Sequence, residues 1–196
     1  MNIASVRIPP KLRLLTLVLA VVVLVAGVMA IVDSSLGGPR RPVDALFVYP
    51  GDIDLLSGDQ WEEKPSLLAG EQVVRRWMNV RTRAYFEQSV IVHSRGFAAL
   101  YGYFAEDPRI NDREDLGKGS VRDARLEVSV AADQSGIYCR QAEQHSREEP
   151  CSRWIYWSRY GIYTIEIDYR EPGLDSTRFS QIIRRVDMKV SSVLNG

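Results

Sequence analysis

The chain of 196 residues carries 25 basic and 25 acidic side chains, so its formal net charge is zero. Three basic residues precede the first acid, Asp33, namely Arg7, Lys11 and Arg13. Residues 33–196 therefore carry 22 basic and 25 acidic side chains. This slightly acidic balance argues against a dedicated nucleic-acid-binding surface, which needs a clear basic excess. The length suits one folded domain rather than two.

An uncharged apolar run over residues 14–32 predicts a transmembrane signal-anchor helix. The run, LLTLVLAVVVLVAGVMAIV, is close to the roughly 20 residues that a helix needs to cross a hydrocarbon core of about 30 Å. Its basic N-terminal flank favours a short cytoplasmic tail at residues 1–13 and a C-terminal domain outside the cytoplasm. A cleaved signal peptide ending near Ala30 is the alternative, although the run exceeds the usual apolar region of roughly 7–15 residues.

The basic residues are nearly all arginine, with lysine only at positions 11, 64, 118 and 189. We interpret this as the coding bias of a GC-rich bacterial genome. The predicted location is therefore the bacterial cytoplasmic (inner) membrane, with a single-pass topology.

Residues 33–66 are predicted to be a Gly/Pro-rich linker, and residues 67–196 an extracytoplasmic α+β domain. Glycine and proline interrupt the first segment repeatedly. The domain is expected to begin with an amphipathic helix of roughly 20 residues capped by Ser66, because apolar side chains recur at steps of three and four residues. These side chains are Val73, Trp77, Val80 and Ala84.

A short β-like segment at residues 89–93 and a helical pattern at 97–104 follow, before a polar loop at 106–120. From Arg122 the apolar period changes to two, which predicts an antiparallel meander. Its strands are expected at residues 122–130, 137–141, 154–159 and 161–170.

The last predicted element is an amphipathic helix that begins after Asp175. One stripe of this helix is apolar, namely Phe179, Ile182, Ile183, Val186, Val190 and Val193. The outer face is expected to carry Arg178, Arg184, Arg185, Asp187 and Lys189. The predicted fold class is thus α+β: one N-terminal transmembrane helix, then a small domain in which an antiparallel β-meander packs against amphipathic helices.

Cys139 and Cys151 are predicted to form a structural disulfide. A hairpin centred near His145 would make the two positions face each other at about the distance that a disulfide spans. An oxidising compartment outside the cytoplasm would preserve the bond. A redox or metal-binding pair is the alternative, but the spacing is not Cys-x-x-Cys, and two thiolates with distant histidines match no zinc pattern.

No catalytic residue, cofactor-binding residue or metal ligand is predicted. The chain lacks the Gly-x-Ser-x-Gly turn of serine hydrolases, and the segment at 117–120 lacks the first glycine and the final hydroxyl of a phosphate-binding loop. The acidic segment 111–115 lacks the alternating ligands of an EF-hand. We expect His93 to be structural. Glu166 and Asp168 are expected to be a solvated strand face paired with Arg159 or Arg170 rather than a catalytic acid and base.

The strand expected at 154–159 is aromatic on both faces. One face must be core, and the other is either covered by a helix or exposed as a partner surface, since Trp, Tyr and Arg dominate interface hot spots. The residues of this candidate partner surface are Trp154, Tyr156, Trp157, Arg159 and Tyr160.

The leading functional hypothesis is a non-enzymatic, membrane-anchored protein whose outer domain binds another protein in a bacterial envelope or secretion assembly. In outline, the tail, single span, helix and antiparallel sheet resemble the periplasmic assembly-factor domains of type IV secretion. The alternatives are a ligand-binding or sensory domain with a pocket lined by Tyr163, Tyr169 and Trp154, and an exported enzyme. The expected partners are the bilayer, through residues 14–32, and an envelope protein. The sequence leaves the oligomeric state open.

Overall fold

A computed structural model describes most of the chain. The described residues are 10–38, 40–53, 56, 60–105, 121–124, 126, 128–140, 151, 153–171 and 173–196. The helices are α1 (Pro10–Gly37), η1 (Val43–Leu46), η2 (Pro50–Asp52), α2 (Gly96–Ala105) and α4 (Ser176–Asn195). The strands are β1 (Trp61–Ala69), β2 (Gln72–Asn79), β3 (Tyr85–Val92), β4 (Val121–Asp123), β5 (Gln134–Arg140), β6 (Arg153–Tyr160) and β7 (Tyr163–Arg170).

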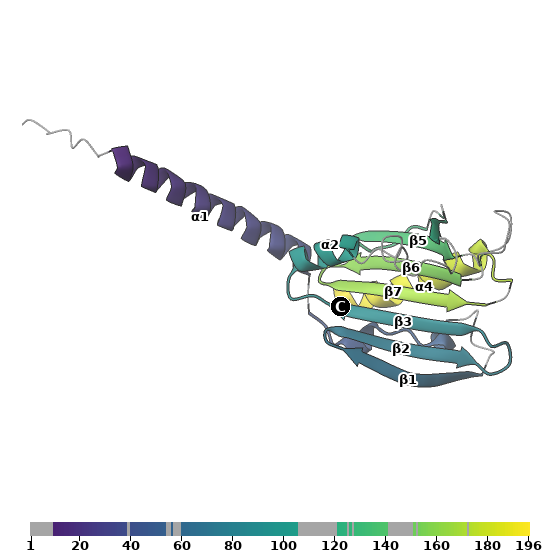
Figure 1. Ribbon diagram of the computed structural model, residues 1–196. Coiled ribbons are helices and arrows are strands. Elements are labelled where there is room, and N and C mark those ends of the chain that lie inside the picture. Colours follow the sequence, from purple (N-terminus) through teal and green to yellow (C-terminus); the bar gives the residue numbers. More distant parts are fainter. Residues whose placement is uncertain are drawn as a thin grey trace, which may run out of the picture.

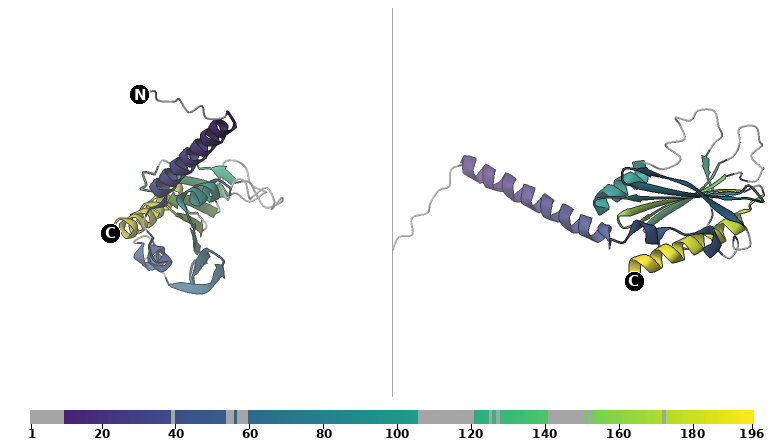
Figure 2. Two further views of the ribbon diagram at one scale, coloured as in Figure 1. Left: turned by 90° about the vertical axis from the view of Figure 1, so that its left-hand side faces the viewer. Right: turned by 90° about the horizontal axis from the view of Figure 1, so that it is seen from below.

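The described residues form one α+β domain built on a seven-stranded sheet of order β1-β2-β3-β7-β6-β5-β4, in which every pairing is antiparallel. Helix α4 and the two short 3-10 helices lie on one face of this sheet, whereas α2 lies on the other face near the end of α1 (Figures 1 and 2). The antiparallel sheet packed against helices confirms the α+β part of the predicted fold class.

The main core lies between the sheet and α4. Alternate side chains of β7 point into it, and all four are at most 1 % exposed: Tyr163, Ile165, Ile167 and Tyr169. The apolar stripe of α4 packs against them, and Asp175 caps this helix by accepting a hydrogen bond from the backbone nitrogen of Arg178 at 2.8 Å. The predicted terminal helix is therefore confirmed. Asp187 is an exception to its predicted outer face, since only 6 % of this residue is exposed.

The predicted amphipathic helix that begins at Ser66 is wrong. Residues 61–79 form the β1–β2 hairpin, which turns at Gly70 with a positive φ of 61°. Val73 and Trp77 are four residues apart, a spacing that places two side chains on one face of a helix but also on one face of a strand. The structure adopts the second arrangement, and Trp77 is buried against Phe86 of β3.

The predicted linker at residues 33–66 also differs from the structure, because its centre packs in the core. Leu46, Phe47 and Val48 are at most 2 % exposed. The buried side chain of Gln88 on β3 donates to the Leu46 carbonyl at 2.9 Å and accepts from the Val48 nitrogen at 2.8 Å. The segment is thus held by a distant strand, and β1 begins before the predicted domain boundary.

The predicted meander is largely present as β5, β6 and β7. The strand expected at 122–130 is limited to β4, and beyond it Leu126, Val128 and Val130 pack against the core without strand pairing. The helix expected at 97–104 is α2, whereas the loop expected at 106–120 lies outside the described residues.

Helix α1 projects away from the sheet (Figure 1). Its side chains are described for residues 17–31, 33, 34, 36 and 37. The large apolar side chains between Leu17 and Ile31 are each more than half exposed. Within the described part of the chain, no helix reaches both the length and the apolar character required to cross a membrane.

Candidate functional site

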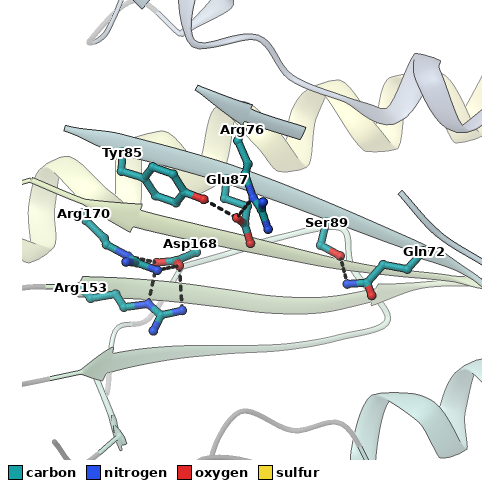
Figure 3. Close-up of polar contacts among 8 residues, drawn as sticks. All are labelled: Gln72, Arg76, Tyr85, Glu87, Ser89, Arg153, Asp168 and Arg170. Atoms are coloured by element: carbon teal, nitrogen blue, oxygen red, sulfur yellow. Dashed lines mark hydrogen bonds and ion pairs between the residues drawn. The ribbon is translucent and has the colours of Figure 1, made fainter. Parts of the chain in front are cut away.

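Polar side chains gather on the sheet face opposite α4, over strands β2, β3, β7 and β6 (Figure 3). The register places Arg76, Glu87 and Asp168 in one row across three neighbouring strands. Their sequence neighbours Trp77, Phe86 and Tyr169 point to the core face. Strand alternation therefore separates an apolar face under α4 from a charged face.

Asp168 is the centre of this charged face. Its side chain is only 2 % exposed. Arg153 contacts both of its carboxylate oxygens, at 2.8 Å from Nε and 2.7 Å from Nη2. Nη2 of Arg170 lies 2.7 Å from the same oxygen, Oδ2, as Nη2 of Arg153. The hydrogen bond to Asp168 raises the pKa of Arg170. Two guanidinium groups therefore hold this carboxylate in one position by charge-assisted hydrogen bonds.

A second group on this face joins Arg76, Glu87 and Tyr85. The Nε atom of Arg76 lies 2.6 Å from Glu87, and the Tyr85 hydroxyl donates to the same carboxylate oxygen. Burial, followed by this hydrogen bond, raises the pKa of Tyr85. The guanidinium of Arg170 lies 4.9 Å from the centre of the Tyr85 ring, a cation–π contact that links the two groups.

These residues leave polar atoms accessible at the surface. The side chains of Arg76, Arg153 and Arg170 are 30, 23 and 49 % exposed. Their neighbours hold them in fixed positions, so little conformational entropy remains to be lost on binding. We call Arg76, Tyr85, Glu87, Arg153, Asp168 and Arg170 the polar face. Chemically it suits recognition of a polar partner through arginine and tyrosine contacts.

The sequence predicts that Asp168 pairs with Arg159 or Arg170 on a solvated strand face. In the structure Asp168 pairs with Arg170 and Arg153, and its side chain is buried rather than solvated. The other members of the polar face were not predicted from the sequence. A partial signal is present at the start of β3, where the partly buried Tyr85 and Glu87 alternate with the buried Phe86 and Gln88. The helix predicted from Ser66 overlaps the start of this strand, so the alternation is too short to stand out in the sequence.

The candidate partner surface predicted on β6 is buried, so that prediction is corrected. Trp154, Tyr156, Trp157, Arg159 and Tyr160 are all at most 5 % exposed. Trp154 stacks on Phe179 of α4 with ring centres 5.2 Å apart, and on the other face Trp157 stacks on Tyr103 of α2 at 6.2 Å. Helices cover both faces of this strand, which explains its aromatic character on both sides.

Arg159 lies beside a cavity of about 220 Å³ between the ends of α1 and α4 and the β6–β7 turn. Its guanidinium donates to the side chain of Gln134 and the carbonyl of Gly161, both at 2.9 Å, and pairs with Asp133 at 3.2 Å. The predicted pocket residues Trp154, Tyr163 and Tyr169 are not in the cavity lining but in the core.

Tyr160 also lines this cavity, and its hydroxyl donates to Asp187 at 2.8 Å. The hydroxyl of Tyr156 is 3.1 Å from that of Tyr160. Burial raises the pKa of Tyr156 to about 12. Asp187 also accepts the backbone N–H of Ala131. This hydrogen-bonded chain accounts for the burial of a carboxylate on α4.

Cys139 and Cys151 form the predicted disulfide, with Cα atoms 5.5 Å apart. The predicted hairpin register differs, because Cys139 is paired with Trp154 rather than with Cys151. His93 is buried, and its Nε2 lies 2.9 Å from the Thr164 hydroxyl. His145 lies outside the described residues.

Among the described residues, no group of three or more His, Cys, Asp or Glu side chains could hold a metal ion. Comparisons of the chain with protein-family models, with curated proteins and with solved structures give no match.

Proposed function

We propose that the protein is a single-pass membrane protein whose extracytoplasmic domain binds a protein partner in a bacterial envelope assembly, without an enzymatic activity of its own. The observation that carries the proposal is the polar face, where held arginine and tyrosine side chains remain partly exposed. Arginine and tyrosine are enriched among the residues that dominate binding energy at interfaces.

The apolar helix α1 supports the membrane part of this proposal. Its large side chains from Leu17 to Ile31 are more than half exposed and contact no core of the domain. Such a surface is costly in water, at roughly 25 cal/mol per Å² of apolar area, and lipid would relieve that cost. Resistance of the full chain to alkaline extraction from membranes tests the anchor, and its release would contradict it.

The binding experiment compares two arginine substitutions in the full-length, tagged protein. Arg170→Ala removes a partly exposed guanidinium from the polar face, whereas Arg184→Ala makes the same change on the exposed side of α4. After cross-linking in intact membranes, we expect the partner to be reduced about tenfold by Arg170→Ala, a typical effect of one hot-spot residue. Arg184→Ala should retain it. Equal recovery from both variants would contradict the proposed surface.

A second candidate function, binding of a small polar ligand, is favoured by the cavity beside Arg159. Its lining combines that buried guanidinium with Asp133 and Ser191. A ligand that binds only the folded state raises the melting temperature. Screening of small polar metabolites against the full chain tests this candidate, and the absence of any thermal shift would oppose it.

A further inference from the structure

Helix α2 carries an exposed aromatic stripe. Phe97, Tyr101 and Phe104 are 50, 70 and 55 % exposed, and their spacing of four and three residues places them on one side of the helix. The opposite side is buried, and Tyr103 there stacks on Trp157 of β6. Three large rings exposed together on one short helix are a feature of interaction sites rather than of an ordinary solvated surface.

This stripe begins at the end of α1. The Asp33 carboxylate on α1 accepts a hydrogen bond from the backbone nitrogen of Phe97 at 3.0 Å. The approach is so close that a Cβ atom on Gly96 would lie 2.6 Å from atoms of Leu36 and Gly37. These contacts fix the first turn of α2 against the last turns of α1, as Figure 1 shows.

The position of this contact along α1 determines how far the aromatic stripe lies from the apolar residues 14–32, measured along the axis of α1. Asp33 follows Ile31 by two residues, or about 3 Å along a helix axis. The interfacial layer of a bilayer is about 5–7 Å deep on each side of the hydrocarbon core. The right-hand view of Figure 2 shows that α2 runs across the direction of α1 instead of continuing it. The helix is therefore placed to lie along an interface that α1 crosses.

Basic side chains flank the same end of α2. Arg40 and Arg95 are exposed, and the Arg40 guanidinium donates to the carbonyl of Ser94 at 3.1 Å. Asp33, an acid at this end of α2, accepts a hydrogen bond from the first turn of the helix. Two exposed cations beside apolar rings are complementary to the phosphates and acyl chains of anionic phospholipids.

We propose that α2 is a second, interfacial membrane contact, in which Phe97, Tyr101 and Phe104 lie at the headgroup–acyl boundary and Arg40 and Arg95 bind lipid phosphates. Aromatic rings are enriched at this depth, and helices with one apolar face bind there. The inference rests on the proposed function, because it requires that α1 spans the membrane. Its consequence is that the domain is held in one orientation, with α2 against the lipid.

The test uses the full-length protein reconstituted in vesicles of phosphatidylethanolamine and phosphatidylglycerol. The photoreactive residue p-benzoylphenylalanine replaces Tyr101 or Phe104, which keeps an aromatic ring at an exposed position. Tyr49 is the matched control, since it is also an exposed tyrosine but contacts Trp77 on the opposite face of the sheet. The same photoreactive residue in place of Val25 tests whether α1 lies in the membrane. Lipid adducts are measured by mass spectrometry after irradiation.

We expect lipid adducts at 101 and 104 to exceed those at 49 by about tenfold, as the contrast between interfacial and aqueous positions requires. Adducts at 25 but not at 101 or 104 would overturn the α2 contact while leaving the anchor intact. Absence of adducts at 25 as well would overturn the anchor and, with it, this inference.

The role of the two arginines is tested separately with Arg40→Gln and Arg95→Gln combined. This variant should lower the adducts at 101 several-fold in vesicles that contain phosphatidylglycerol, and change them little in pure phosphatidylcholine, because only the first surface is negatively charged. Unchanged adducts in both vesicles would overturn the phosphate contact.

Discussion

Asp168 on β7 and Arg153 on β6 form an ion pair through two parallel contacts of 2.8 and 2.7 Å, at a carboxylate that is almost fully buried. The pair is completed by Arg170. A buried carboxylate held by two guanidinium groups balances its desolvation cost only while all partners are present.

The substitution Asp168→Asn should therefore destabilise the domain by about 2 kcal/mol, because two partly buried arginines lose their shared counter-charge. Urea unfolding measures this change. Asp44→Asn is the control, since Asp44 pairs with Arg75 but is 78 % exposed, and its loss should cost less than about 0.5 kcal/mol. Equal costs for the two variants would contradict the structural role of Asp168.

Gly96→Ala should disturb the contact between α1 and α2. The added Cβ would lie 2.6 Å from the backbone of Leu36 and Gly37, and neither backbone can move as a flexible side chain could. We expect a loss of about 1–3 kcal/mol from overpacking, measured by thermal unfolding. Gly51→Ala adds the same atom where nothing lies within 4 Å, and it should leave the melting temperature nearly unchanged.

Asp33→Ala should loosen the start of α2. The variant removes the acceptor for the Phe97 N–H, and loss of such a helix-terminal acceptor costs about 1 kcal/mol. Hydrogen exchange at the amide of Phe97 should accelerate accordingly. In Ser34→Ala the lost hydrogen bond is within α1, to the carbonyl of Ile31, so protection at Phe97 should persist. Comparable exchange at Phe97 in both variants would contradict a stabilising role of the hydrogen bond between Asp33 and Phe97.

Replacement of both Cys139 and Cys151 by serine should cost about 2–3 kcal/mol, the value for a short loop closed by a disulfide. Denaturant unfolding with and without a reducing agent measures the effect. The reductant should destabilise the natural protein and leave the double variant unchanged. A natural protein that is insensitive to complete reduction would refute the stabilising role.

His93 should make stability depend on pH. Burial lowers its pKa below the ordinary value of 6.5, so below that value the unfolded chain binds a proton that the folded protein does not. Stability is therefore complete above about pH 6.5 and decreases as pH falls toward the folded-state pKa. His93→Gln should therefore reduce the fall of the melting temperature just below pH 6.5. Aspartate and glutamate side chains ordinarily titrate at lower pH, at about 4. An unchanged slope in His93→Gln would show that other groups cause it.

Local patterns alone were enough to predict several elements. The apolar alternation of β7 and the apolar stripe of α4 each have a single clear period, β6 is a short run of aromatic and apolar residues, and the disulfide follows from two cysteines that flank the turn of a predicted hairpin. These features depend on residues close together in the chain, so they can be read from short stretches of sequence.

The remaining features depend on contacts between residues far apart in the chain. Val73 and Trp77 fit both a helix and a strand, and pairing of β2 with β3 selects the strand. Residues 46–48 resemble a linker until Gln88, forty residues later, supplies hydrogen bonds to their backbone. The polar face exists because β3 pairs with β7 across a long separation in sequence. Such contacts are non-local, and no periodicity within a short window encodes them, which is the physical reason that the sequence did not reveal them.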